Sequence, residues 1–517
     1  MPTVASSTEL ITPDRPWPVK ARHAAVDVTH LVRFRTSGLR RRTTGPALGL
    51  GFLVLTALAA VVPAFTEGAA SSARASDVRL LLPTAMAGFL IIAVVAAVAS
   101  GGGRELIPRD EAVAFPVSPT TDHLGALLLA PLNIAWLIQA WFLLGATAYA
   151  LVPALLLPAQ IGMLLWLAIA TALAQVVAWA MEALRRRPHG VGAVRALGVL
   201  GVLAGLVLQL SGRLTDVLDR IPTVLLIGGL TEGWSWRWAG TVLAELLVLA
   251  AAVALGAVPA HLAARRTPRD EVRAESGHRP PRPMPRSVLA ALVRTDRASV
   301  WRAVPMRRGL AVLAVAPGLV AIAGDLPWST MTILPGLVAS GGALLFGVNA
   351  WCLDGRGALW RASLPVAPSS VFAARAWVLA EFLMVAAAVT LALASLRAGL
   401  PNRVELAALL STWVVVTLQV VAASLRWSAR NPYPVDLRSA RATPAPPVKM
   451  VGYSARLAVS TTLTGLVFGA LTRAQDWQAP VLVAFVFLCW SAFRLARTRA
   501  RWLDPVDRAR VVTAVSA

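Results

Sequence analysis

The chain has 517 residues, of which 57% are hydrophobic and 15% are charged. Soluble domains carry roughly 25% charged residues, so this composition excludes an ordinary soluble protein and predicts a chain that crosses a membrane many times. The apolar segments are as long as membrane helices and rich in Leu, Val and Ala, which excludes the weak alternation of a membrane β-barrel. We therefore expect an all-α membrane protein.

The formal net charge of +23 comes mainly from arginines that lie between the hydrophobic runs. Charge scattered in this way indicates membrane topology, and we expect no nucleic-acid partner. The two cysteines, Cys352 and Cys489, lie in or at the ends of apolar runs and lack the spacing of a metal site. We expect packed thiols, with no metal site and no disulfide.

The chain begins with a polar tail over residues 1–23. Residues 24–42 then combine Val28, Leu31 and Val32 with many arginines, which predicts a helix lying on the cytoplasmic leaflet; a solvated basic tail is the alternative. Runs of about 20 apolar residues next predict twelve membrane-spanning helices. These lie near residues 46–65, 80–100, 124–150, 154–182, 193–211, 239–261, 309–325, 331–352, 371–396, 404–425, 450–471 and 478–496.

The arginines fix the orientation of these helices, because cytoplasmic loops retain Lys and Arg. With both termini cytoplasmic, most basic residues fall inside, including Arg185-Arg186-Arg187 and the Arg- and Pro-rich linker 262–286. Losing or adding one span would place one of these basic segments outside. The basic residues left outside are Arg74, Arg79, Arg213, Arg220, Arg237, Arg397, Arg403 and Arg473.

The longest outer connection, residues 212–238, contains the apolar run Val224 to Ile227 and three tryptophans, Trp234, Trp236 and Trp238. It could form short helices that dip into the outer leaflet, or it could be an aromatic anchor for the sixth span. After the linker, residues 287–304 show apolar side chains at helical spacing, which predicts a second interfacial helix.

The two halves of the chain look like repeats of each other. Leu31-Val32-Arg33 pairs with Leu292-Val293-Arg294, and Phe115-Pro116-Val117-Ser118-Pro119 pairs with Leu364-Pro365-Val366-Ala367-Pro368, in the same order and at similar spacing. Both halves begin and end inside, so we expect two parallel six-helix repeats. The expected domains are the tail 1–23, a first half 24–261, the linker 262–286, a second half 287–496 and a basic cytoplasmic tail 497–517.

The paired proline motifs have two interpretations. Each resembles a helix start, with a capping hydroxyl and a proline in the first turn. Alternatively, each is a short rigid cytoplasmic element that binds another protein, in which Phe115 or Leu364 supplies an apolar contact and nearby charges, among them Asp354, Arg356 and Arg361, orient it.

This plan of an interfacial helix, six spans, a cytoplasmic element between spans two and three and an outer segment before the sixth resembles the permeases of type-two (ABC-2-like) ABC exporters. The resemblance covers residues 24–510 and describes two such permeases fused in one chain, of the bacterial plasma (inner) membrane. The short outer connection 472–477 departs from the family pattern.

The resemblance implies a permease that exports an amphipathic or lipophilic cargo. Two copies of a separate cytoplasmic ABC ATPase would bind the proline elements, and ATP and Mg²⁺ would belong to that partner. The chain has no Gly-x-x-x-x-Gly-Lys-Ser/Thr motif, and Lys20 and Lys449 lie in no Gly-rich loop. We therefore expect a transport subunit in contact with membrane lipids, with no catalytic residues and no cofactor of its own.

Glu245 and Glu381 lie in predicted spans, where a carboxylate is costly unless it is neutral, paired or hydrated. They could line a translocation path or hydrogen-bond between helices.

A proton-coupled secondary transporter is the alternative function, although the Gly-x-x-x-Asp-Arg-x-Gly-Arg-Arg loop of the major facilitator family is absent. A membrane-embedded enzyme is a third reading, but Glu67 and Asp77 lack the supporting residues of a catalytic loop.

Overall fold

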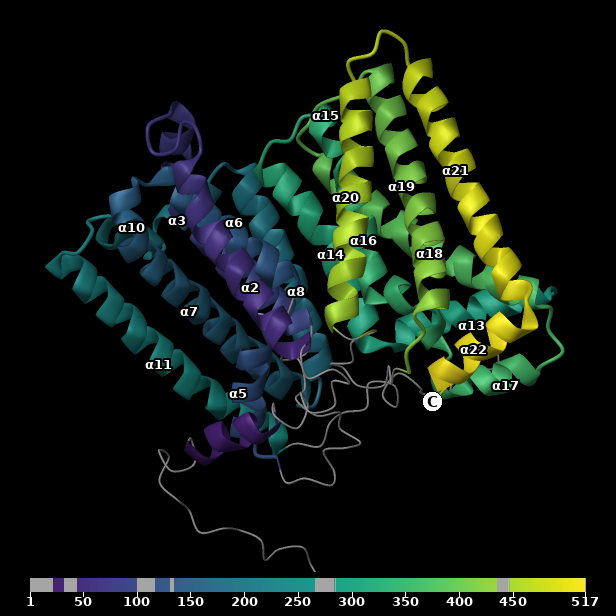
Figure 1. Ribbon diagram of the computed structural model, residues 1–517, viewed down its shortest axis with the longest axis horizontal. Coiled ribbons are helices and arrows are strands. Elements are labelled where there is room, and N and C mark those ends of the chain that lie inside the picture. The colour runs from purple at the N-terminus through teal and green to yellow at the C-terminus, as the bar shows by residue number, and fades with distance from the viewer. Residues whose placement is uncertain are drawn as a thin grey trace, which may run out of the picture. The chain divides into compact units, whose positions relative to one another are not determined.

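A computed structural model of the chain contains helices and no strand among the residues that it describes (Figure 1). The predicted all-α class is therefore confirmed for this part of the chain. Phe115 and Pro116, most of the linker 262–286, and Val32 and Arg33 lie outside it. The described residues are 22–31, 44–99, 117–130, 134–265, 283, 285–434, 445 and 447–516.

Ten segments within the described residues are long and apolar enough to cross a membrane. The chain is thus a multi-pass membrane protein. They comprise α3 (Ala73–Ala99), α7 (Pro153–Arg185), α8 (Gly190–Leu210), α11 (Trp236–Ala264), α14 (Val304–Ala323), α15 with α16 (Trp328–Met331 and Leu334–Leu345), α18 (Pro368–Ala394), α19 (Arg403–Arg430), α20 (Pro447–Leu471) and α21 (Gln478–Leu503). Two shorter apolar helices are α2 (Thr44–Val61), which continues into the 3-10 turn η1 (Val62–Phe65), and α6 (Ile134–Ala150).

Two predicted spans differ from the helices observed. The range 124–150 is divided between two helices, α5 (Pro119–Leu129) and α6, and residues 131–133 between them lie outside the described part of the chain. The range 331–352 is helical only to Leu345, after which the 3-10 segment η3 (Gly347–Leu353) is fully buried. The backbone of η3 leaves α-helical geometry, and its buried polar groups find hydrogen-bond partners on α19 instead. Ser428 Oγ donates to Gly347 O and accepts from Ala350 N at 2.9 Å.

The chain forms two compact units. Unit one comprises residues 1–98, 102–191 and 218–267, and unit two comprises residues 99–101, 192–217 and 268–517. The predicted outer connection contains two short helices, α9 (Leu214–Asp219) and α10 (Thr223–Leu230); that they dip into the outer leaflet remains a prediction. In unit one α10 packs on α7 and α11, where Leu226 and Ile227 touch the core.

Unit one is built around the pairing of α7 with α11. Ala260 and Ala263 of α11 pack with Trp179 and Ala183 of α7, and small side chains at such a contact let two helices approach closely. Gly256 of α11 instead leaves room for His123 of α5. Trp166 of α7 donates from Nε1 to the carbonyl oxygen of Met86 at 3.1 Å, which ties α3 to the same core. A helix over residues 22–31 packs Val28 and Leu31 against Leu124 and Leu129 of α5.

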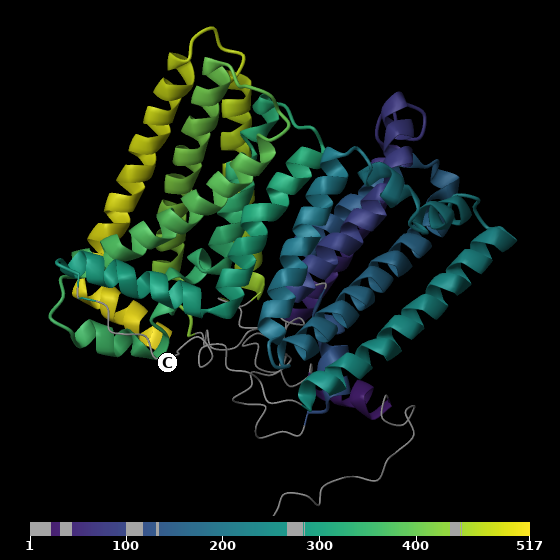
Figure 2. The same cartoon turned by 180° about the vertical axis from the view of Figure 1, so that it is seen from behind.

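Unit two is built around α16, which touches α14, α18, α19 and α20. Its glycines explain the close packing: a Cβ on Gly336, Gly341 or Gly342 would lie within 3.1 Å of Thr461, Leu313 or Leu383. The predicted second interfacial helix is α13 (Val288–Arg302), which buries Val293, Asp296 and Val300. Seen from behind, α13 lies across the lower ends of the other helices of this unit (Figure 2).

The C-terminal tail 497–517, to which the sequence assigned no structure, continues α21 to Leu503 and then forms α22 (Pro505–Ser516). Asp504 begins α22, since its Oδ1 accepts from the amides of Val506 and Asp507 at 2.9 Å. Val511 and Val515 are buried against the rest of unit two.

Candidate coupling surface

The proline element of unit two is a short folded structure between α16 and α18. It consists of η3, the turn η4 (Gly355–Gly357), α17 (Ala358–Ser363) and an extended segment that ends at Pro368. Gly355 has a φ of +48°, a conformation that favours glycine and lets the chain turn from η3 into η4.

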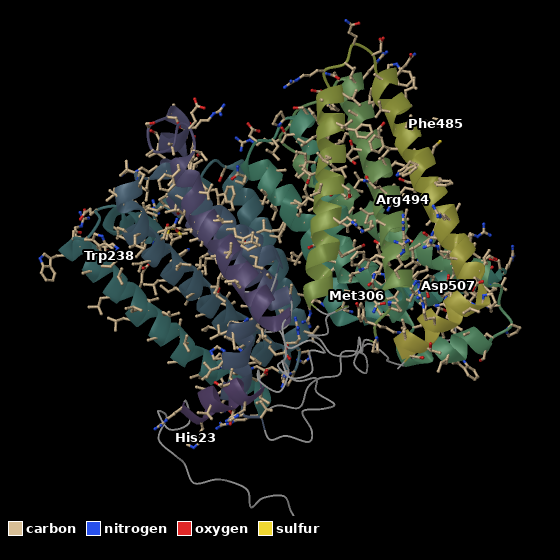
Figure 3. All side chains as sticks on the ribbon, in the orientation of Figure 1. His23, Trp238, Met306, Phe485, Arg494 and Asp507 are labelled. Carbon is tan, nitrogen blue, oxygen red and sulfur yellow. The ribbon has the colours of Figure 1, made fainter. Side chains whose placement is uncertain are left out.

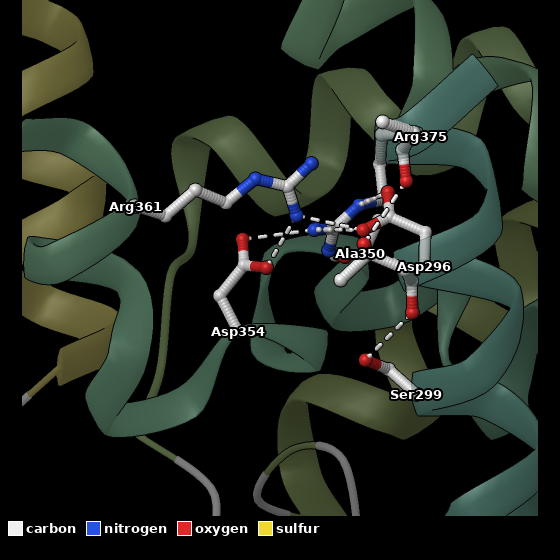
Figure 4. A network of polar contacts seen from close by, with 8 residues as sticks. Asp296, Ser299, Ala350, Asp354, Arg361 and Arg375 are labelled. Carbon is white, nitrogen blue, oxygen red and sulfur yellow. Dashed lines mark hydrogen bonds and ion pairs between the residues drawn. The ribbon is translucent and has the colours of Figure 1, made fainter. Parts of the chain in front are cut away.

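Four charged side chains fix this element to its neighbours (Figure 4). Arg375 of α18 donates from Nε to Asp296 of α13 at 3.0 Å and from Nη2 to Asp354 at 2.8 Å. Arg361 of α17 donates from Nη1 to both carboxylates at 2.6 Å. Arg375 also donates from Nη1 to the carbonyl oxygen of Ala350. Two carboxylates and two guanidinium groups thus neutralise each other.

This network is buried, which makes it a rigid anchor. Arg375 and Asp296 are inaccessible to solvent, and the side chains of Asp354 and Arg361 are 15% and 13% exposed. The proposed role of Asp354 and Arg361 in orienting a partner remains a prediction, but the structure shows that both bind inside the unit. The side chain of Arg356 lies outside the described residues.

Stacked tryptophans join the same element to the C-terminal helices. Trp351 of η3 stacks on Trp502 of α21 with ring centroids 3.7 Å apart, and Trp502 Nε1 donates to the carbonyl oxygen of Pro368 at 3.0 Å. A cavity of about 170 Å³ lies between this stack and α22, lined in part by Val366, Pro368 and Val515. Val366 and Pro368 of the proline motif therefore face inward, whereas Leu364, Pro365 and Ala367 are exposed.

Several large apolar side chains on and beside this element are exposed. Trp360 is 73% exposed, Leu359 54% and Leu364 39%. Val506 at the start of α22 is 76% exposed. Large apolar side chains held on a rigid element outside the long apolar helices are typical of a protein-binding surface. We refer to Leu359, Trp360, Leu364 and Val506 as the apolar face.

In unit one the described part of the proline element begins at Val117, which is half-buried. Ser118 caps α5, because its Oγ accepts from the amide of Thr121 at 3.0 Å, and Pro119 occupies the first turn. The helix-start reading is confirmed here. It is only half right in unit two, where Ala367 stands at the cap position of α18 and provides no side-chain acceptor, although Pro368 is in the first turn.

The start of α5 is held by buried polar contacts to α11. Thr120 Oγ1 lies 3.0 Å from His261 Nε2, and the buried His123 lies with Nε2 3.1 Å from the carbonyl oxygen of Val253. Burial lowers the pKa of His123, although the Val253 carbonyl and Asp122 oppose this shift. Both proline elements are thus anchored from within, one by an ion network and the other by neutral hydrogen bonds.

The two candidate path residues differ in their surroundings. Glu245 on α11 is buried, and neither carboxyl oxygen has a hydrogen-bond partner among the described residues. Glu381 on α18 is half-exposed and pairs with Arg297 of α13 at 2.7 Å. Only Glu245 has the character of an isolated carboxyl at membrane depth. Whether either residue lines a path remains a prediction.

Sequence reasoning missed Asp296, Arg375 and Trp502 as parts of this site. A signal was present for Arg375, because it is a charged residue in an otherwise apolar run, where a buried partner is required.

No group of three or more potential metal ligands gathers within the described part of the chain, where Cys352 is buried and Cys489 exposed. No family model, curated protein or solved structure matches this chain.

Proposed function

We propose that this chain is the membrane-spanning permease of an ATP-driven exporter, in which separate ATPase subunits bind the two proline elements. The observation that supports this most is the combination in unit two of a buried, charge-neutral anchor with an outward apolar face. When a bound partner moves, such an element can displace α13 and α18, because the ion network joins the element directly to both helices.

The proposal includes twelve spans in two parallel repeats. At 1.5 Å per residue, α2 with η1 extends for about 33 Å and α6 for about 25 Å, against a hydrocarbon core of about 30 Å. The first is long enough to cross, and α6 can cross with slight thinning of the bilayer. Corresponding helices also pack alike, since α7 pairs with α11 in unit one and α19 with α21 in unit two.

The test is co-purification with a candidate ABC ATPase encoded beside this gene. Trp360→Asp and Leu364→Asp, singly and together, are expected to reduce ATPase association at least about tenfold, because they charge an apolar contact. The matched control is Trp236→Asp, which makes the same change at a 94% exposed residue on the predicted outer side. Normal ATPase binding by a correctly inserted double variant would refute the coupling role.

A proton-coupled secondary transporter is the second candidate, favoured by the buried, unpartnered Glu245. If this reading is right, Glu245→Gln abolishes transport, and transport by the unchanged chain collapses with the proton gradient while ATP depletion has no direct effect. The exporter reading predicts the opposite dependence on ATP and on the gradient. Reconstituted vesicles with controlled ATP and pH separate the two.

A further inference from the structure

Two adjoining cavities in unit two, each of about 380 Å³, are lined by arginines from four helices. Arg426 and Arg430 of α19 line both cavities. Arg456 of α20 and Arg494 of α21 complete the first, and Arg501 of α21 and Arg510 of α22 complete the second. Figure 3 labels Arg494 on the length of α21 and shows side-chain nitrogens gathered near it.

These arginines have little compensating charge. Asp507 is the acidic residue that lines the second cavity, and no ion pair joins any of the six arginines to a carboxylate within the described residues. Arg494 has a buried Nε that finds no hydrogen-bond partner there. Like charges that converge on one space repel each other, so the arrangement is unfavourable while the cavities hold only water.

Ordinary topology does not account for this arrangement. Cytoplasmic ends of membrane helices are rich in arginine, and a cation near the end of α19 interacts well with the helix dipole. Four of the six arginines here are indeed exposed, whereas Arg426 is half-buried and Arg494 has a buried Nε. Here Arg456 and Arg494 lie about two and a half turns inside their helices and converge with Arg426 on one cavity.

We propose that the two cavities bind a phosphate-bearing anion, and that its source is the headgroup of an anionic membrane lipid. Arginine forks match phosphate oxygens bidentately. The first cavity also has apolar wall residues, Ala423, Trp427 and Leu457, which suit the start of an acyl chain. A lipid with two phosphates fits two basic cavities that share Arg426 and Arg430 better than a lipid with one phosphate. The binding of an anion here does not depend on the proposed function, although Trp502, which holds the proline element of unit two, also lines the second cavity.

The experiment uses the full chain in nanodiscs of phosphatidylcholine. Binding is measured by native mass spectrometry and by thermal shift, with cardiolipin in one arm and soluble pyrophosphate in the other. The variant Arg426→Gln/Arg494→Gln is expected to bind cardiolipin at least about tenfold more weakly, since each lost charged hydrogen bond costs roughly that factor. Arg426→Lys/Arg494→Lys keeps the charge and is expected to recover part of the binding.

The matched control is Arg403→Gln/Arg473→Gln, which removes the same charge from exposed residues at or beside the opposite ends of α19 and α20. Loss confined to the cavity variant supports the site, and pyrophosphate binding that equals cardiolipin binding assigns it to a soluble phosphate instead of a lipid. Equal loss in both variants, or no binding in either arm, overturns the proposal. If the double variant melts early in phosphatidylcholine alone, Arg456→Gln, at an exposed residue, replaces it.

Discussion

Arg375 is the residue on which the anchor of unit two depends. It contacts two carboxylates and one backbone carbonyl while fully buried, so removing its charge leaves Asp296 and Asp354 with one guanidinium between them. We predict that Arg375→Gln destabilises the folded protein by about 3–5 kcal/mol, the usual cost of breaking a buried ion pair from one side. The melting midpoint in detergent or nanodiscs measures this.

Arg297→Gln is the control for that prediction, because it breaks an ion pair between the same two helices that is half-exposed. Solvent screens such a pair, so the expected loss is at most about 1 kcal/mol. Equal losses from the two variants would mean that burial does not distinguish the pairs.

His123 is predicted to make unit one sensitive to acid. Its pKa is lowered by burial, so the folded protein resists protonation at a pH where the unfolded chain already accepts a proton. The unfolded state then binds more protons, and stability falls as the pH falls below the ordinary value of about 6.5. Melting midpoints measured between pH 7.5 and 5 are expected to decline less steeply in His123→Gln, and an unchanged slope would contradict the assignment.

At the scale of elements, hydrophobic runs predicted where helices lie, and tertiary contacts decided where they end. The segment 347–352 is apolar enough to extend a span, yet its backbone leaves the helix because Ser428 and the carbonyl of Tyr433, which accepts from Asn349 Nδ2 at 2.8 Å, provide alternative partners. Sequence spacing could not reveal partners that lie on another helix. For the same reason, Asp354 was predicted to be important but its ion pairs with Arg361 and Arg375 were not.

α20 approaches α15 and the turn that leads into α16 through a pair of glycines, Gly465 and Gly469, at four-residue spacing. A Cβ on Gly469 would lie 2.9 Å from the carbonyl oxygen of Ser329, so backbone atoms would have to move. We predict that Gly469→Ala costs about 1–3 kcal/mol, as overpacking does. Thermal unfolding measures the loss.

The matched control for Gly469 is Gly452→Ala on the same helix, where nothing lies within 4 Å of the added carbon. That change is expected to leave stability unchanged or to raise it by up to about 1 kcal/mol, because alanine favours helix. A loss as large as that of Gly469→Ala would show that α20 tolerates no substitution and that close packing is not the cause.

At the scale of the molecule, composition and charge predicted the all-α membrane class, which the described residues confirm. The number of crossings depends on α2 and α6, whose lengths are marginal. Contacts in unit one link their ends: the amide of Ala70 donates to the carbonyl oxygen of Tyr149 at 2.9 Å, and Ser72 Oγ lies 3.2 Å from the Tyr149 hydroxyl. The segment after α2 and the end of α6 therefore lie on the same side of the unit.

The side of the membrane on which the segment after α2 lies tests whether α2 is one of twelve spans. In a chain with Cys352→Ala and Cys489→Ala, the added thiols Ser71→Cys, after α2, and Ser363→Cys, on α17, both occupy exposed positions. If α2 crosses with the N-terminus inside, a membrane-impermeant maleimide labels Ser71→Cys from outside intact cells and reaches Ser363→Cys only after permeabilisation. If both thiols react only after permeabilisation, α2 does not cross the membrane and the proposed repeat of six spans in the first half is wrong. The buried ion network of unit two does not depend on this result.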